Sequence, residues 1–273
     1  MDITLLGTGG PIPSPDRAGP STLVTAGPTR LLIDAGRGVC MRLVAAGVFP
    51  LMLDAVLVTH LHSDHLSDLN DVITTRWVMA PVPMPITLYG PPGLRETVDG
   101  LLAMLAPDIR YRIAHHEDLT EGPRVEVVEV SPGDTFTVGE TSIRVGATDH
   151  RPVEPTVAFR VDHDGHSVVL GGDGVPCSGL DELCVGADAY VQTVLREDLV
   201  ALIPMPRMQD VLDYHSTVTQ AAETATRAGV RHLVLTHYIP GLPPGAEEEW
   251  RAIAAAAFTG DVILGDDLTT LSL

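Results

Sequence analysis

Short apolar runs alternate with segments of helical spacing along most of the chain, and glycine or proline stands between many of them. Apolar or β-branched runs bounded by turn residues predict strands. The predicted strands are Ile3–Leu6, Ser21–Thr25, Arg30–Ile33, Val56–Val58, Ile86–Tyr89, Arg124–Val130, Ser142–Ala147, Ala158–Val161, Ser167–Leu170, Ala187–Thr193, Leu233–Leu235, Asp261–Leu264 and Leu268–Leu273. Apolar residues three and four apart predict helices over Val39–Ala46, Leu66–Ala80, Gly93–Leu105, Val218–Ala228 and Glu247–Ala257. The pattern is that of an α/β protein.

Two segments lack a clear period. Ala106–Pro123 is predicted to be irregular, and Leu195–Tyr214, which contains Pro204 and Pro206, is predicted to form a lid or pocket wall. No break in composition divides the 273 residues, so we expect one domain over residues 1–273, made of two halves that meet near Asp149–Val153.

A dense polar cluster follows the predicted strand Val56–Val58. It contains His60, His62, Asp64 and His65. Side chains two apart on an extended backbone point the same way, so the first three can converge on one point. Neutral imidazoles and carboxylates are ligands that zinc takes. The spacing therefore predicts a metal site at a strand end, in preference to a solvated polar loop.

The sequence His-Leu-His-Ser-Asp-His at this strand end resembles the metal signature of the metallo-β-lactamase superfamily. The opening Leu5–Pro11, the segment His215-Ser216-Thr217 and the late Thr236-His237 are similar to its ribonuclease Z and arylsulfatase-like branch. The resemblance covers nearly the whole chain. It implies a four-layer αββα sandwich with a dinuclear metal site at one edge, and a homodimer.

The resemblance also implies roles for single residues. One metal would be held by His60, His62 and His150, the other by Asp64, His65 and His237, and Asp173 would bridge them. The catalytic group would be His215, Asp64 and Asp173, with His215 donating a proton to the leaving oxygen or stabilising its charge. The alternatives are that Asp173 is a simple turn aspartate and that His215 is a surface histidine at a helix start.

Three further positions bear on the metal site. Asp34 ends a predicted strand, and it either supports a ligand histidine, as in the superfamily, or caps the helix Val39–Ala46. For Asp54, too, a supporting role at the metal site and a purely structural role are both open. The superfamily usually has Thr or Ser after the bridging aspartate. Gly174 departs from that and removes a hydroxyl from behind the site.

Charge limits the choice of partners. The chain has 36 acidic residues against 17 basic ones, and its net charge is −19. Such a surface repels polyanions at long range, so we expect a small anionic ester substrate in preference to a large nucleic acid, unless a local basic patch survives. Arg196 or Arg207 could bind an anionic group or form surface ion pairs, and Trp77 could line a pocket or belong to the core.

No apolar stretch approaches the ~20 residues that span a bilayer, and no secretory signal is recognised, so we expect a cytoplasmic protein without a membrane partner. Cys40, Cys177 and Cys184 show no metal or disulfide spacing and are expected to be reduced. His115 and His116 are expected at the surface.

These patterns predict a dinuclear zinc hydrolase of phosphodiester or aryl phosphate and sulfate esters, with Mn²⁺ or iron as other candidate metals. Two cations would acidify a shared water that attacks the phosphorus or sulfur centre, and His215 would assist the leaving group. Four alternatives stay open: a lactone or carboxylic ester hydrolase, a tRNA 3′-processing endonuclease, a non-catalytic metal- or ligand-binding protein, and a single-iron oxidation site.

Overall fold

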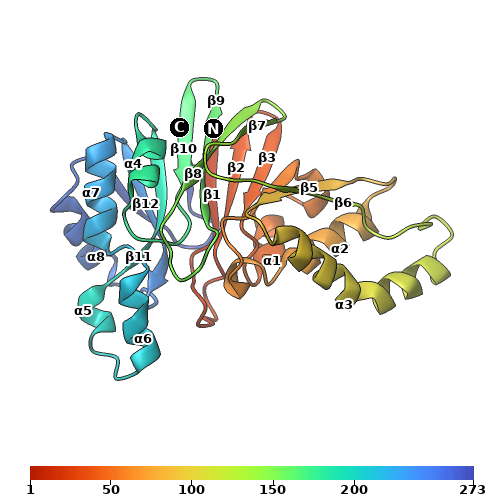
Figure 1. The fold of residues 1–273 in the computed structure, drawn as a ribbon, viewed down its shortest axis with the longest axis horizontal. Coiled ribbons are helices and arrows are strands. Elements are labelled where there is room, and N and C mark those ends of the chain that lie inside the picture. Colours follow the sequence, from red (N-terminus) through yellow and green to blue (C-terminus); the bar gives the residue numbers. More distant parts are fainter.

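The computed structural model describes residues 1–273 as two seven-stranded sheets packed face to face, with helices on both outer sides (Figure 1). In order, the first sheet contains β14 (Thr270–Ser272), β1 (Asp2–Gly7), β2 (Ser21–Ala26), β3 (Thr29–Ile33), β4 (Ala55–Leu57), β5 (Ile86–Gly90) and β6 (Val125–Glu129). The second contains β13 (Asp261–Leu264), β12 (His232–Ile239), β11 (Ala189–Leu195), β10 (His166–Leu170), β9 (Val157–His163), β8 (Thr141–Ala147) and β7 (Thr135–Val138).

Both sheets are mixed. The pairs from β3 to β6 and from β10 to β13 are parallel, and the remaining pairs are antiparallel. Parallel strands are covered on both faces, which explains why all seven residues of β11 are buried. The inner faces meet in one apolar core, to which Val24 and Leu57 contribute from the first sheet and Phe159 and Val191 from the second.

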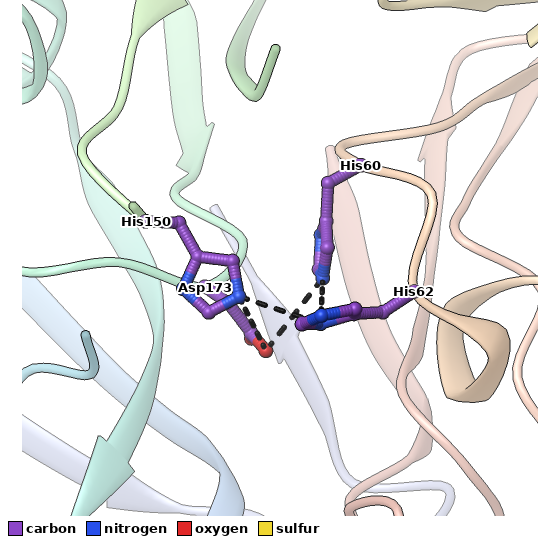
Figure 2. Close-up of side chains that lie close together, drawn as sticks. All are labelled: His60, His62, His150 and Asp173. Carbon is purple, nitrogen blue, oxygen red and sulfur yellow. Dashed lines mark hydrogen bonds and ion pairs between the residues drawn. The ribbon is translucent and has the colours of Figure 1, made fainter. Parts of the chain in front are cut away.

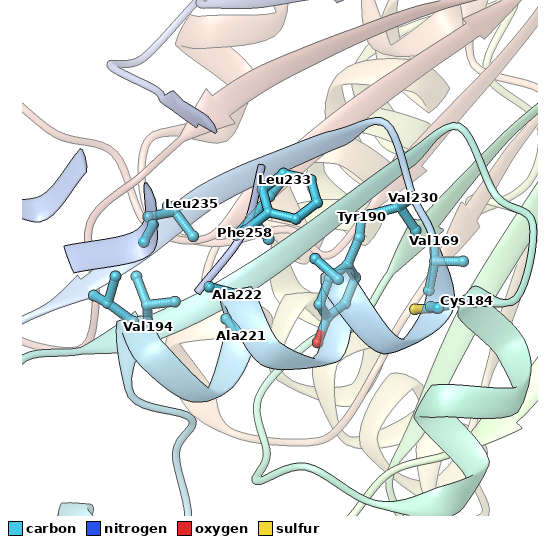
Figure 3. Packing of buried hydrophobic residues seen from close by; sticks show 14 of the residues in the cluster. Val169, Cys184, Tyr190, Val194, Ala221, Ala222, Val230, Leu233, Leu235 and Phe258 are labelled. Atoms are coloured by element: carbon cyan, nitrogen blue, oxygen red, sulfur yellow. The ribbon is translucent and has the colours of Figure 1, made fainter. Parts of the chain in front are cut away.

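Helices cover the outer faces. Over the first sheet lie α1 (Val39–Ala45), α2 (Leu69–Met79) and α3 (Leu94–His115), and over the second lie α4 (Ser178–Cys184), α7 (Val218–Ala228) and α8 (Glu247–Ala255) (Figure 1). Beneath α7, Ala221 and Ala222 pack on Tyr190 and Leu233 of the sheet (Figure 3). Small residues on this face let the helix lie close to the large side chains. The predicted four-layer αββα sandwich is confirmed.

Three local predictions were wrong. Helix α3 continues through Pro107 to His115, where an irregular segment was expected; proline costs one helical hydrogen bond, and the far part of α3 projects from the body (Figure 1), where water can satisfy the freed carbonyl. Strand β7 and helix α4 were not predicted. The chain also passes between the sheets at residues 130–134, earlier than the expected boundary near Asp149–Val153, because the β7–β8 hairpin already belongs to the second sheet.

No helix of the structure is both long enough and apolar enough to cross a membrane.

Candidate active site

The loop after β4 carries four of the candidate metal ligands. His60 and His62 lie on extended backbone, and Asp64 and His65 lie in a one-turn 3-10 helix, Ser63–His65. His60, Asp64 and His65 are buried and His62 is half-buried. The turn bends the chain so that His65 faces the same space as the preceding side chains, although it belongs to the next element.

The seven candidate ligands gather into two adjoining groups. In the first, ligand atoms of His60, His62, His150 and Asp173 lie within 4.8 Å of one another (Figure 2). His62 Nδ1 is 3.1 Å from His60 Nε2 and 3.4 Å from His150 Nε2. The second group, within the same limit, is Asp64, His65 and His237. Loops after β4, β8 and β10 supply six of these residues and strand β12 supplies His237, so both sheets contribute.

Asp173 stands between the two groups. Its Oδ2 atom lies 3.8 Å from His60 Nε2 and 4.0 Å from His150 Nε2 in the first group. The same atom lies 3.4 Å from His65 Nε2 and 3.6 Å from His237 Nε2 in the second. This is the position that a bridging carboxylate requires.

His215 adjoins the same carboxylate without belonging to either group. Its Nε2 lies 3.2 Å from Asp173 Oδ2, and its Nδ1 lies 3.2 Å from the carbonyl oxygen of Val211. The side chain is buried at the start of α7, where Thr217 caps the helix and forms a capping box with Gln220. A histidine in this place can hold a proton at the edge of the metal site.

Comparison with known proteins decides the family. The profile of the beta-lactamase superfamily domain matches residues 29–238, which is most of the chain. The chain belongs to the β-lactamase superfamily. It is therefore a metal-dependent hydrolase, as the sequence predicted.

Among its relatives in the β-lactamase superfamily are two mycobacterial proteins named Ribonuclease Z. The chain is 57% identical to that of Mycolicibacterium gilvum over 270 residues, which cover 98% of this chain and 94% of the relative. It is 58% identical to that of Mycobacterium avium over 270 residues, covering 98% and 96%. The predicted resemblance to ribonuclease Z is confirmed.

Solved structures of the β-lactamase superfamily share the fold. The metallo-β-lactamase fold protein YhfI of Bacillus subtilis superimposes with a TM-score of 0.75 at 21% identity, covering 99% of this chain and 98% of that one. The short form of human tRNase Z gives a TM-score of 0.73 at 24% identity, covering 100% and 99%.

The donor set fits divalent cations. His65 Nε2 is buried without a hydrogen-bond partner and faces the carboxylates of Asp64 and Asp173 at 3.9 and 3.4 Å. Leaving a buried ring nitrogen unpaired is unfavourable unless another ligand takes it. Imidazoles and carboxylates without a thiolate or lysine suit zinc and related metals. In this superfamily fold, the cluster indicates binding of divalent metal.

The two groups differ in their protonation. Burial holds the pKa of His60 well below 6.5 and lowers that of His150 to about 4, so these imidazoles are neutral and ready to bind a cation. Burial also disfavours charge on His65 and His237, but Asp173 outweighs it, with Asp34 acting on His65 and Asp64 on His237, and both pKa values are raised.

Metal binding at pH 7 is expected to release about one or two protons per chain, because His65 and His237 must lose their protons to become ligands. Since the pKa values of the first group are lowered, filling that group releases none. Isothermal titration calorimetry in two buffers of different ionisation enthalpy measures the release. Equal heats in both buffers would contradict this assignment, and affinity for the second ion should weaken as the pH falls.

Asp34 supports the second group. Its Oδ2 lies 2.8 Å from His65 Nδ1 and accepts a hydrogen bond from Thr59 Oγ1, and its Oδ1 accepts one from the Thr59 backbone N–H. The helix α1 is capped by Gly38, so the N-cap alternative for Asp34 is wrong. Asp34 and His237 both adopt positive φ, 58° and 48°, which non-glycine residues rarely do and which is common at functional sites. Asp54, in contrast, accepts from the backbone of Arg30 at the surface.

The hydroxyl missing after Asp173 is supplied by another strand. Gly174 has φ 152°, and a Cβ there would lie 2.8 Å from the Asp149 carbonyl oxygen, so Thr or Ser does not fit. On neighbouring β11, the buried Thr193 Oγ1 donates to Asp173 Oδ1 at 2.6 Å. This bond leaves Oδ2 free to face the histidines. No single-sequence pattern points to Thr193, because its partner comes from strand register.

Replacing Thr193 with valine is expected to weaken metal binding about 10- to 100-fold, since the carboxylate between the two groups would lose the bond that orients it. Thr193→Ser keeps the hydroxyl and should restore the affinity. Competition with a chromophoric chelator measures both variants. Affinity equal to wild type in Thr193→Val would show that the hydroxyl does not orient Asp173.

Several candidate residues lie outside the site. Arg196 is buried, pairs with Asp198 and Glu249 and lies over the Trp250 ring, so of its two possible roles the structure shows the ion pairs. Arg207 is exposed on α6 (Pro206–Asp210) and does not line the cavity beside the metal groups. Trp77 donates its indole N–H to the Glu121 carbonyl and lines a separate hollow between α2 and residues 116–124.

A cavity of about 790 Å³ opens beside the two metal groups. His62, Asp64, Asp173, His215 and His237 form its floor. One wall is made by residues 203–214, so the prediction that Leu195–Tyr214 forms a pocket wall is confirmed. The segment contains α5 (Glu197–Val200), α6 and the 3-10 turn η3 (Val211–Asp213).

Proposed function

We propose that this protein is a dinuclear zinc endonuclease that hydrolyses a phosphodiester bond near the 3′ end of precursor tRNA. The observation that carries the proposal is the position of Asp173 Oδ2, which faces both metal groups and lies 3.2 Å from His215 Nε2. Five ligand imidazoles outnumber the two carboxylates, which favours zinc as the native ion; Mn²⁺ and iron are the other candidates.

When bound, the two cations would acidify a water and polarise the phosphoryl oxygens. His60, His62 and His150 would hold one ion, Asp64, His65 and His237 the other, and Asp173 both. His215 would donate from Nε2 to the leaving oxygen. Because its Nδ1–H points to the Val211 carbonyl and fixes the ring, the donating form is the imidazolium, whose second proton would lie on Nε2 beside the Asp173 carboxylate. Expelling a ribose oxygen unprotonated is costly, so this proton matters most for a natural RNA substrate.

RNA replaces the small ester as the favoured substrate. Relatives that match nearly the whole chain at 57% and 58% identity carry the name Ribonuclease Z. The charge argument against RNA was weaker than it seemed from the sequence, because salt screens exposed charges beyond about 8 Å at physiological ionic strength, whereas binding depends on contacts inside the site.

The test is hydrolysis of four substrates by the zinc-loaded protein: a tRNA precursor with a 3′ trailer, bis(p-nitrophenyl) phosphate, p-nitrophenyl sulfate and a lactone. We expect one cut in the precursor, abolished by chelation and restored by zinc. Turnover of the sulfate or the lactone without cleavage of RNA would refute the proposal and favour the ester hydrolase. Metal binding without turnover of any substrate would favour a binding protein.

A further inference from the structure

The cavity beside the metal groups has one wall that the proposed chemistry does not use. This wall is formed by residues of the segment Leu195–Tyr214, namely Ile203, Met205, Met208, Val211 and Tyr214. Met205 is 56% exposed and Met208 is half-buried, and both line the cavity. Exposed methionines at the mouth of a cavity are adaptable contacts for flat apolar groups.

Away from the metal ligands, the cavity has no free cationic side chain that could bind a second anionic group. Arg17 is the only Arg among the residues that line the cavity, and the chain has no Lys. The guanidinium of Arg17 already contacts Asp266 Oδ1 at 2.7 Å and Thr8 Oγ1 at 2.6 Å, and it lies over the Tyr238 ring. The cavity beyond the metal ligands therefore fits an uncharged group better than a phosphate.

The wall adjoins His215, the proposed proton donor. Tyr214 precedes His215 in the chain, and their ring centroids are 4.7 Å apart. If His215 gives its proton to the leaving oxygen, the group attached to that oxygen must lie beside it. That group would therefore occupy the cavity that Tyr214 and Met208 also line.

The wall is also held in shape before any substrate arrives. The Gln209 side-chain amide donates to the carbonyls of Val200 and Ile203 at 2.8 Å each, which ties α5 to α6. Met208 and Val211 pack against a small core of Leu195, Val200 and Ile239. A preformed wall costs little ordering free energy on binding.

We propose that Tyr214 and Met208 form a binding site for the nucleobase of the nucleoside that carries the leaving oxygen. A base stacks on an aromatic ring through its π-face, so such a site accepts any base and orients the scissile phosphate without reading sequence. The proposal rests on the proposed function, because it takes the direction of cleavage from the role of His215. After hydrolysis this nucleoside ends in a hydroxyl, and the phosphate stays on the other product.

The test measures equilibrium binding of RNA to the zinc-loaded His215→Ala protein, in which cleavage is slow. Two RNAs are compared, one intact and one without the base at the nucleoside that carries the leaving oxygen, identified as the product end that lacks the phosphate. We expect the abasic RNA to bind about 5- to 100-fold more weakly. In the Tyr214→Leu or Met208→Ala background, this difference should shrink to about twofold.

Leu202→Ala is the matched control, because Leu202 lies on the same segment, is 78% exposed and does not line the cavity; it should keep the full difference. An abasic RNA that binds as well as the intact one, or a difference that persists in both wall variants, would overturn the proposal. If the protein cleaves tRNA but binds intact and abasic RNA equally, the nucleobase site alone is refuted. If the wild-type protein cleaves no RNA, the proposed function is refuted, and the nucleobase site is refuted with it, because the cut defines the nucleoside that carries the leaving oxygen.

Discussion

Replacing Asp173 with asparagine is expected to remove at least one of the two metal ions and to lower kcat/KM for RNA by about 10³-fold or more, on the order of 4 kcal/mol of transition-state stabilisation. The carboxylate is buried and its Oδ2 faces histidines of both groups. Although burial opposes ionisation, His237 and His65 hold its pKa well below the usual range, so it is charged at every working pH. A neutral amide cannot attract two cations.

Elemental analysis after dialysis, together with steady-state kinetics, measures the effect of Asp173→Asn. Asp164→Asn is the matched control: Asp164 is exposed in the turn between β9 and β10 and already has positive φ, 48°, which asparagine tolerates. Two ions per chain and near-normal turnover in Asp173→Asn would show that this carboxylate does not bridge the groups.

His215→Ala is expected to lower kcat on RNA about 10²- to 10⁴-fold while both metal ions stay bound, because His215 lies beside the ligands but belongs to neither group. The leaving group decides the size of the loss. A ribose oxygen needs a proton on departure, whereas p-nitrophenolate leaves without one. Bis(p-nitrophenyl) phosphate should therefore lose much less turnover than RNA in the same variant.

His115→Ala, which removes an exposed histidine at the end of α3, serves as the control and should change neither rate. Equal losses on both substrates would indicate that His215 stabilises charge or structure and does not donate a proton. Unchanged turnover of both would remove His215 from the mechanism.

Most of the candidate metal ligands could be predicted from the sequence because they follow strand ends, whereas His237 lies within β12. The spacing of His60, His62 and Asp64 after an apolar run predicted their convergence, and the αββα topology does bring His150, Asp173 and His237 to the same edge. The family resemblance, more than periodicity, identified these last three, since a single histidine after a strand carries little information.

What the sequence missed depends on contacts between distant segments. Thr193 reaches Asp173 only because β11 pairs with β10. The order of strands in a sheet cannot be derived from the sequence of either strand alone. The sequence left the role of Arg196 open, because its partner Glu249 comes from a helix 53 residues later. Helix α3 continues past its predicted end at Leu105 to His115, because a projecting helix tolerates the carbonyl that Pro107 leaves without a helical partner.

Anomalous diffraction from crystals of the zinc-loaded protein tests the central claim most directly. Two zinc peaks per chain are expected, one among His60, His62 and His150 and the other among Asp64, His65 and His237, with Asp173 bound to both. A single peak, or two ions with Asp173 bound to neither, would contradict the account.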